Sequence, residues 1–367
     1  MPTQLLSWLM SAFAFLMPLL FGQPTSKPET RMAPLVEQMP DYGVWPTEEF
    51  ETDQAPLWIP TWILRPVHTV RNLLLPMDSG SKNEGIVVLY KGKIVYEWYA
   101  DGWNKDRIHA LNSCTKSVVS ALVGIAMEDG FIHSLDDKIV DYFQDLDIAI
   151  DAELKNEITI EQMLTMTSGL PGDIDPTYPA LNAMELSEAE IAAINQRFTN
   201  DSAKTFLELC SMTAVPGERW NYSSSGAHLL LGVVAHAIDR PLEDYVDEKL
   251  FGPMGITNYR WGKWGGQYDG GGGLAMTPRD MAKFGYLYLS YGRWEDARLI
   301  PADWVAQSPP ASNSPFGYGR MFWNVRGLPF AGYEANGAYG QVIQIFPAYD
   351  LVIVRTGIYA MNLNITF

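Results

Sequence analysis

The chain holds few of the side chains that most often bind metals or activate a serine. Its 367 residues include two cysteines, Cys114 and Cys210, and five histidines. Neither cysteine has the spacing of a zinc site, and we expect two buried free thiols in preference to a disulfide, which would require an exported protein. His228 and His236 are eight residues apart on one predicted helix, and we interpret them as packed or surface histidines. The sequence therefore predicts no metal and no organic cofactor.

Positive charge is also scarce. The 26 lysines and arginines are outnumbered by 43 acidic residues, which gives a formal net charge of -17. Such a surface repels nucleic acid and anionic lipid, so we exclude a nucleic-acid partner. No internal repeat or low-complexity segment stands out, whereas hydrophobic residues make up 47% of the chain and aromatic residues 12%. These fractions support a sizeable core in one large domain or two smaller ones.

The N-terminal region contains a long apolar run. Residues 5–22 are interrupted only by Ser7, Ser11 and Pro18. No lysine or arginine precedes the run and no clean small-x-small cleavage site ends it, so a signal peptide and a membrane anchor both stay open. A buried helix fits less well, because the run is not amphipathic. We expect a protein that is secreted, periplasmic, or membrane-anchored with residues 5–22 as its tether.

Three segments follow from this organisation: residues 1–22 are the signal peptide or anchor, residues 23–60 an extended lead-in, and residues 61–367 the folded domain. Near the start of that domain, residues 86–90 and 94–99 are predicted strands joined by a tight turn at Lys91-Gly92-Lys93, so we expect a β-hairpin. An apolar helical run follows Ser113 and stops near Gly130. Because it is apolar over most of its circumference, we expect a buried central helix.

The rest of the domain divides into a helical part and a strand-rich end. Helical and loop patterns dominate an insertion at about residues 158–268, and Thr277 caps a further helix with Pro278 at its first position. Residues 316–323, 341–346 and 351–356 are predicted strands. The predicted class is α/β in layered α+β form: an antiparallel sheet, built from both ends of the chain and flanked by helices, with a mostly α-helical insertion.

Ser113 and Lys116 are the candidate nucleophile and base. They lie three residues apart at the start of the buried helix, so both side chains fall on one face within hydrogen-bonding reach. No serine stands in a Gly-x-Ser-x-Gly elbow, which weakens a Ser-His-Asp site, and a lysine that burial keeps partly neutral can accept the proton instead. The spacing alone is common, and an ordinary helix start is the simpler interpretation.

Two further segments strengthen the candidate pair. Residues 216–226 form a turn that leads into a helix and offers the Tyr222 phenol and nearby serine hydroxyls; a helix cap with a packed tyrosine is the alternative. Residues 336–341 are small residues that enter a strand, where glycines let a substrate approach the strand edge, although an ordinary strand-entry turn would look the same. Four glycines at 270–273 lack the context of a phosphate loop, and we interpret them as a flexible turn beside the site.

Together, residues 113–124, 164–170, 222–225 and 337–341 resemble the serine β-lactamase-like superfamily of class C β-lactamases, penicillin-binding D,D-peptidases and related esterases. More narrowly they look like the branch that contains the aminohexanoate-dimer (nylon-oligomer) hydrolases. The resemblance spans roughly residues 60–357 and implies a β-lactamase/transpeptidase-like fold. It also implies that Ser113 is the acylated nucleophile and that Lys116 is its base or keeps the base deprotonated. Tyr222 would relay a proton to the leaving group, and Ser224 would hydrogen-bond the lysine or the substrate.

The third motif carries both a supporting role and a departure from the family pattern. The resemblance implies an oxyanion hole formed by the backbone N–H groups of Ser113 and Gln341, with Gly340 beside it. Lysine or histidine usually opens this motif, whereas this chain has Ala338. A cation there helps to bind the carboxylate of penicillins and peptidyl-D-Ala substrates, so its absence argues against efficient β-lactamase or D,D-peptidase activity.

The predicted function is that of a serine hydrolase that cleaves a small-molecule ester or amide through an acyl-enzyme on Ser113. A β-lactamase or D,D-peptidase is the alternative among enzymes. A non-catalytic cell-envelope binding protein is the alternative from another class, suggested by Ala338 and by the lack of a helix pattern after the last predicted strand. Apolar and aromatic residues that could line an acyl pocket are Tyr178, Leu181, Phe198 and Trp220.

Overall fold

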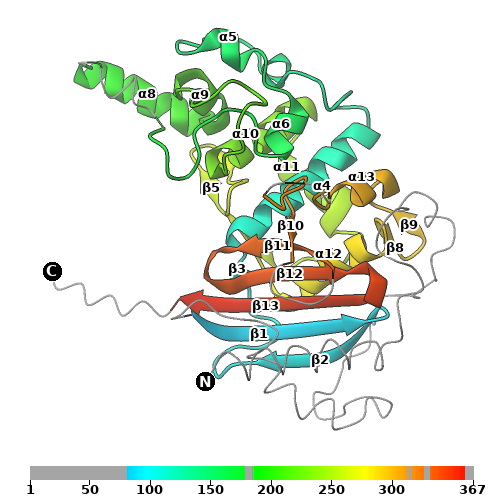
Figure 1. Ribbon diagram of the computed structural model, residues 1–367. Coiled ribbons are helices and arrows are strands. Elements are labelled where there is room, and N and C mark those ends of the chain that lie inside the picture. The colour runs from blue at the N-terminus through cyan, green and yellow to red at the C-terminus, as the bar shows by residue number, and fades with distance from the viewer. Residues whose placement is uncertain are drawn as a thin grey trace, which may run out of the picture.

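A six-stranded antiparallel sheet and a block of helices face each other across one central helix (Figure 1). The computed structural model describes residues 81–177, 184, 186–311, 314, 316–325 and 331–359. The predicted signal peptide or anchor at 1–22 and the lead-in at 23–60 lie outside these residues. Within the described part of the chain, no helix combines the length and the apolar character needed to cross a membrane.

The sheet joins the two ends of the domain, as the sequence predicted. Its order is β10-β11-β12-β13-β1-β2, and β1 pairs with β13. The six strands are β1 (Ser81–Tyr90), β2 (Lys93–Tyr99), β10 (Trp323–Asn324), β11 (Tyr333–Gly337), β12 (Gln341–Phe346) and β13 (Leu351–Tyr359). Lys91 and Gly92 both have positive φ, of 50° and 72°, which matches the twist of the β1–β2 hairpin.

The prediction of a strand at residues 316–323 is wrong. Only β10 forms there, because the backbone turns repeatedly: Gly317 and Met321 have φ of 63° and 60°. Gly319 also donates its N–H to Phe322 O, which closes a tight turn. The aromatic residues of this segment suggested a strand, yet left-handed backbone positions break the extended geometry that a strand requires.

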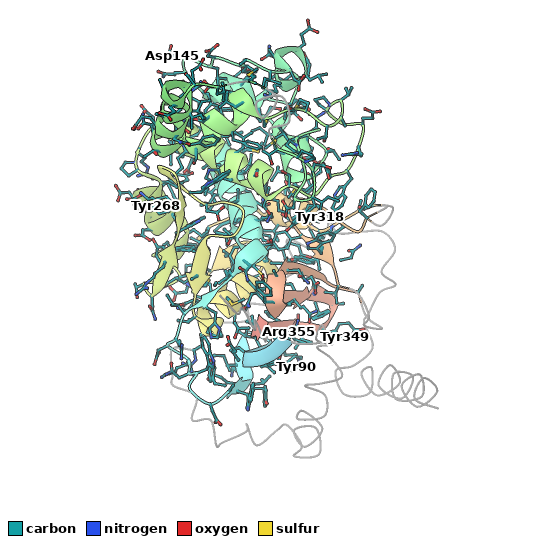
Figure 2. The ribbon with its side chains drawn as sticks, turned by 90° about the vertical axis from the view of Figure 1, so that its left-hand side faces the viewer. Tyr90, Asp145, Tyr268, Tyr318, Tyr349 and Arg355 are labelled. Atoms are coloured by element: carbon teal, nitrogen blue, oxygen red, sulfur yellow. The ribbon has the colours of Figure 1, made fainter. Side chains whose placement is uncertain are left out.

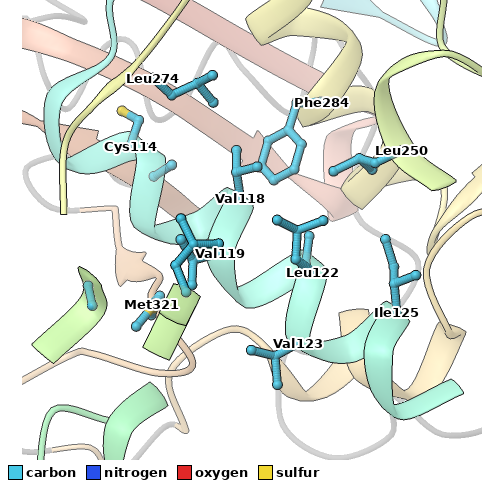
Figure 3. Close-up of a cluster of buried hydrophobic side chains, with 14 of the residues drawn as sticks. Cys114, Val118, Val119, Leu122, Val123, Ile125, Leu250, Leu274, Phe284 and Met321 are labelled. Carbon is cyan, nitrogen blue, oxygen red and sulfur yellow. The ribbon is translucent and has the colours of Figure 1, made fainter. Parts of the chain in front are cut away.

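Helix α4 (Thr115–Glu128) is the central element, and every residue from Thr115 to Ala126 is buried. Figure 3 shows its apolar side chains meeting residues from four other parts of the chain, namely Leu250, Leu274, Phe284 and Met321. Helix α12 (Pro278–Leu289) covers the sheet, and a Cβ on its Gly285 would lie 2.6 Å from Val352 Cγ1 of β13. Such close packing holds α12 firmly against the sheet.

The helical block contains the predicted insertion. Its helices are α5 (Ala152–Lys155), α6 (Ile160–Leu164), α8 (Glu188–Asn200), α9 (Ser202–Leu209), α10 (Ser224–Ala237) and α11 (Leu242–Val246), which continues as a π-helical turn over Asp247–Phe251. Short strands that the sequence did not signal connect the block to the rest. One small sheet contains β3 (His109–Ala110), β4 (Tyr259–Trp261) and β7 (Leu274–Met276). A second contains β5 (Lys263–Trp264) and β6 (Gln267–Tyr268). Near α12 lie the pair β8 (Arg293–Trp294) and β9 (Ala297–Arg298), and α13 (Ala302–Gln307).

Candidate active site

Ser113 lies in a 3₁₀ turn, Asn112–Cys114, that runs directly into α4. The sequence placed it in the first turn of the α-helix, whereas the structure has a tighter turn there, which begins with a left-handed φ of 48° at Asn112. The i, i+3 contact survives this difference: Lys116 Nζ lies 2.9 Å from Ser113 Oγ. The predicted nucleophile and base are therefore side by side.

Lys116 Nζ has three hydrogen-bonding neighbours. Besides Ser113 Oγ they are Ser224 Oγ at 3.0 Å and the Gly271 carbonyl oxygen at 2.6 Å. Ser224 opens α10, so the site joins the N-terminal ends of two helices to the four-glycine turn. An ammonium group has three hydrogens and can satisfy all three oxygens, whereas a neutral amine has two hydrogens and one lone pair.

Burial shifts Lys116 towards the neutral amine. Its side chain is only 1% exposed. Desolvation lowers its pKa to about 8, although the nearby carboxylates of Asp173 and Asp269 favour the charged form. At pH values near 8 the amine is thus a base at a pH where an exposed lysine would be an ammonium ion.

The hydrogens of the neighbouring groups fix which side of the amine faces Ser113. Ser224 Oγ donates its hydrogen to Asp173 Oδ2 at 2.9 Å, so towards Lys116 this hydroxyl can only accept. The Gly271 carbonyl is an acceptor as well. Both N–H donors of a neutral Lys116 are then directed to Ser224 and Gly271, and its lone pair is left for the Ser113 hydroxyl.

Tyr222 lies on the other side of the nucleophile. Lys116 Nζ sits 4.8 Å from the centre of its ring, and its hydroxyl hydrogen-bonds with Ser113. Burial raises the pKa of Tyr222 above its ordinary value, although the hydrogen bond with Ser113 works in the opposite direction. The phenol therefore keeps its proton when Lys116 has lost one, which suits a proton donor rather than a base.

The turn between β11 and β12 brings the third motif against Ser113. A Cβ on Gly337 would lie 3.2 Å from Ser113 N and 2.2 Å from Leu111 O, so only glycine fits this close approach. Cys114 Sγ lies 3.4 Å from Gln341 O. The buried Gln341 side chain hydrogen-bonds Gly357 of β13, which leaves its backbone rather than its side chain for a substrate.

Gly340 and Ala338 shape the same turn. Gly340 has a φ of 91°, and its carbonyl accepts a hydrogen bond from Arg355 Nε at 2.9 Å. Asn112 Nδ2 donates to Ala338 O at 2.9 Å and so ties the turn to the residue before Ser113. The motif thus keeps its backbone geometry, while position 338 presents a methyl group in place of a cation.

Three residues of the site were not found from the sequence: Asn112, Asp173 and Gly271. The four glycines did signal the last of them, but as a flexible turn. In the structure they are packed, because a Cβ on Gly270 would lie 2.6 Å from Ala227 O and one on Gly271 would lie 2.8 Å from Ser224 O. Asp269 Oδ1 accepts the Gly271 N–H at 2.8 Å and orients its peptide.

The remaining candidates fall in different places. Trp220 lies beside Tyr222, with ring centres 6.3 Å apart, whereas Phe198 packs against Trp264 of β5. Tyr178 and Leu181 lie outside the described residues. Cys114 and Cys210 are free and buried.

The two histidines of α10 are packed as the sequence suggested. His228 Nε2 contacts Ser202 Oγ at 2.8 Å, and His236 Nε2 contacts Asp201 Oδ2 at 2.8 Å. Over the residues that the structure describes, no group of three or more histidine, cysteine or acidic side chains is arranged to hold a metal ion.

The antiparallel sheet with its helical block is the fold of β-lactamases and transpeptidases. The chain belongs to the beta-lactamase family, whose model matches residues 81–356. A 6-aminohexanoate-dimer hydrolase of Paenarthrobacter ureafaciens is 23% identical over 301 residues, covering 74% of this chain and 71% of that protein. Beta-lactamase-like protein 2 of Dictyostelium discoideum is 26% identical over 191 residues, and the match covers 49% of this chain but only 33% of that protein.

Solved structures support the same fold. A Bacillus anthracis protein that carries the 6-aminohexanoate-dimer hydrolase name superposes with a TM-score of 0.63 at 21% sequence identity, over 77% of this chain and 75% of that one. At this level of identity the likeness shows the fold, and the chemistry has to come from the residues of this chain.

Proposed function

We propose that this protein is a serine hydrolase that cleaves an ester or amide bond through a covalent acyl-enzyme on Ser113. One observation carries the proposal: the two N–H donors of a neutral Lys116 are committed to Ser224 and Gly271, so its lone pair faces Ser113 Oγ. A serine hydroxyl becomes a good nucleophile when a positioned base removes its proton.

The steps follow from the positions of the hydrogens. Lys116 takes the hydroxyl proton while Ser113 Oγ forms a bond to the substrate carbonyl carbon, and the backbone N–H groups of Ser113 and Gln341 hold the resulting oxyanion. Tyr222 then donates its proton to the leaving oxygen or nitrogen as the ester or amide bond breaks, and Lys116 returns a proton to Tyr222. Water attacks the acyl-enzyme by the reverse sequence, which releases the acid and restores Ser113.

The charges around the nucleophile favour substrates without a carboxylate. Asp173 and Asp269 both act electrostatically on Lys116, and Ala338 supplies no cation where carboxylate-binding relatives carry one. A substrate carboxylate would therefore meet these two negative charges and find no cation at position 338. The name of the Paenarthrobacter relative, a 6-aminohexanoate-dimer hydrolase, supports a hydrolase with a small-molecule substrate.

Labelling with a fluorophosphonate tests the nucleophile. We expect a single adduct on Ser113, located by mass spectrometry of the digested protein, and no adduct in Ser113→Ala. Folded protein that stays unlabelled would favour a non-catalytic binding protein with the same fold. An adduct on another serine would assign the chemistry to a different site.

Substrate preference tests the second part of the proposal. A chromogenic cephalosporin and a short-chain p-nitrophenyl ester are offered to the same preparation, and we expect the ester to be turned over and the cephalosporin hardly at all. Cephalosporin turnover well above ester turnover would identify a β-lactamase or D,D-peptidase and overturn the interpretation of Ala338.

A further inference from the structure

Five aromatic rings pack together directly beside the proposed nucleophile. The Tyr222 ring lies 5.7 Å from Trp323 and 6.0 Å from Tyr318, and those two rings meet edge to face at 4.5 Å. Trp220 stacks on Phe316 with ring centres 4.7 Å apart and planes only 15° from parallel. We call Trp220, Phe316, Tyr318 and Trp323 the aromatic wall; Tyr222 connects it to Lys116.

The aromatic wall is anchored at one end and open at the other. Tyr318 is only 6% exposed and lies where the helical block meets the sheet (Figure 2). Phe316 is 45% exposed, and Trp220 and Trp323 are half-buried. Exposed phenylalanine is costly in water, and here one face of its ring is covered by Trp220 while a large part stays accessible.

We propose that the aromatic wall is the acyl-binding subsite and that it takes an uncharged acyl group ending in an aryl ring, which packs against Phe316. This inference rests on the proposed function of Ser113. No member of the wall is charged, and offset or edge-to-face contacts with such a cluster favour a flat apolar ring over a straight or charged chain. Asp173, exposed and hydrogen-bonded to Ser224, adds negative charge near Tyr222.

The path of rings from Tyr222 to Phe316 favours an acyl group longer than acetyl. Two steps lead from Tyr222 to Phe316 through Trp220, with ring-centre separations of 6.3 Å and 4.7 Å. An aryl ring attached directly to the carbonyl would remain near Tyr222. A ring on a linker of two or three methylene groups extends farther from the carbonyl carbon, so we choose 3-phenylpropionyl and 4-phenylbutyryl groups to reach past Trp220 to Phe316.

Replacing Phe316 separates recognition from chemistry. We expect Phe316→Ala to lower kcat/KM for p-nitrophenyl 4-phenylbutyrate about tenfold, mainly through KM, because a ring contact is lost. Hydrolysis of p-nitrophenyl acetate should stay within about twofold, because its acyl group does not reach the wall. Phe316→Trp should restore most of the loss, since it returns an aromatic surface to the same position.

Phe131 provides a matched control. It is another partly exposed phenylalanine, 37% exposed, and it packs edge to face on Tyr245 beyond the end of α4. Phe131→Ala should leave both esters unchanged. An equal loss on both esters in Phe316→Ala, or a loss on the phenylbutyrate ester in Phe131→Ala, would contradict the subsite. Equal turnover of acetyl and phenylbutyryl esters by the unaltered protein would overturn it too.

Fluorophosphonate labelling and the ester series together distinguish failure of the aryl subsite from failure of the proposed catalytic function. If fluorophosphonate labels Ser113 and the acetate ester is hydrolysed, the catalytic proposal stands and the ester series alone judges the subsite. If Ser113 is not labelled and neither ester is cleaved, the catalytic proposal fails and the subsite fails with it.

Discussion

Two serine-centred sets of polar side chains contact α10, one through Ser224 and the other through His228. One is Ser113 with Lys116 and Tyr222. The other is Ser202 with His228 and Asp269, where Ser202 Oγ lies 2.8 Å from His228 Nε2. By residue type alone the second set is the more familiar nucleophile, base and acid.

The direction of the hydrogens distinguishes the two sets. Ser202 donates its hydrogen to Trp264 O, so His228 Nε2 has to donate to Ser202 and cannot act as its base. His228 Nδ1 also lies 3.9 Å from Asp269, and both Ser202 and His228 are fully buried. At Ser113, by contrast, the two N–H donors of a neutral Lys116 are directed to Ser224 and Gly271, so the lone pair of the amine is left for the Ser113 hydroxyl. Residue identity alone therefore does not distinguish the candidate nucleophile from the buried serine; hydrogen direction and access do.

Replacing each serine in turn should give the largest difference in turnover between the two sets. Ser113→Ala should abolish acylation and turnover with the fold intact. Ser202→Ala should keep turnover and lower the free energy of unfolding by about 1–3 kcal/mol, because it leaves the Trp264 carbonyl and the His228 N–H without a partner. Burst kinetics with a p-nitrophenyl ester and urea unfolding measure the two effects.

The opposite pattern would reverse this assignment. Substantial turnover by Ser113→Ala, together with inactive but folded Ser202→Ala, would make the buried set catalytic and require an opening that exposes it.

Removing each base is expected to have the next largest effect. Lys116→Ala should lower kcat by more than about a hundredfold, the size of a general-base contribution. Lys116→Arg should not rescue it, because a guanidinium stays protonated and offers no lone pair. His228→Asn should stay within about threefold. A near-normal rate in Lys116→Ala would mean that another group accepts the proton.

The pH dependence of kcat/KM separates the two sets without any substitution. Desolvation places the pKa of Lys116 at about 8, and only the deprotonated amine is a base, so activity on a neutral ester should rise with pH up to about 8 and then level off. Below that value the rate should fall about tenfold per pH unit. Burial lowers the pKa of His228 below 6.5, so a histidine base would instead give a plateau that begins below 6.5.

The parts that the sequence predicted depend on local pattern, and the parts that it missed depend on contacts between distant segments. Local strand and turn patterns predicted β12 and the β1–β2 hairpin, and i, i+3 spacing placed Ser113 beside Lys116. The contacts of Lys116 with Ser224 and Gly271 join residues 108 and 155 positions apart. The family resemblance implied the first of them, whereas neither a spacing nor a composition predicted the second. The strand expected at 316–323 failed because backbone dihedrals, not side-chain types, decide that segment.

The smallest of the expected effects comes from replacing Asp173, because the Asp173 carboxylate accepts the hydrogen of the Ser224 hydroxyl. In Asp173→Asn the new amide oxygen can still accept the Ser224 N–H, but the amide nitrogen is a donor and cannot accept the Ser224 hydroxyl. The freed hydroxyl can then donate to the lone pair of Lys116 and compete with Ser113. We expect the plateau of kcat to fall about tenfold, the scale of one hydrogen bond to a charged group.

The same substitution should also move the pH dependence, with a sign that separates charge from hydrogen direction. The Asp173 carboxylate favours charged Lys116, so its loss lowers the pKa of Lys116 and shifts the rise in activity to lower pH. Asp175→Asn is the matched control, because the Asp175 carboxylate accepts hydrogen bonds from Asn221 Nδ2 and Gly172 N, whereas Ser224 donates to Asp173. If Asp173→Asn shifts the pH dependence but keeps the full plateau, Asp173 acts through its charge alone and Ser224 does not direct the lone pair. A lower plateau in Asp173→Asn with an unchanged one in Asp175→Asn would instead establish that a catalytic serine in this fold depends on where a neighbouring serine sends its single hydrogen.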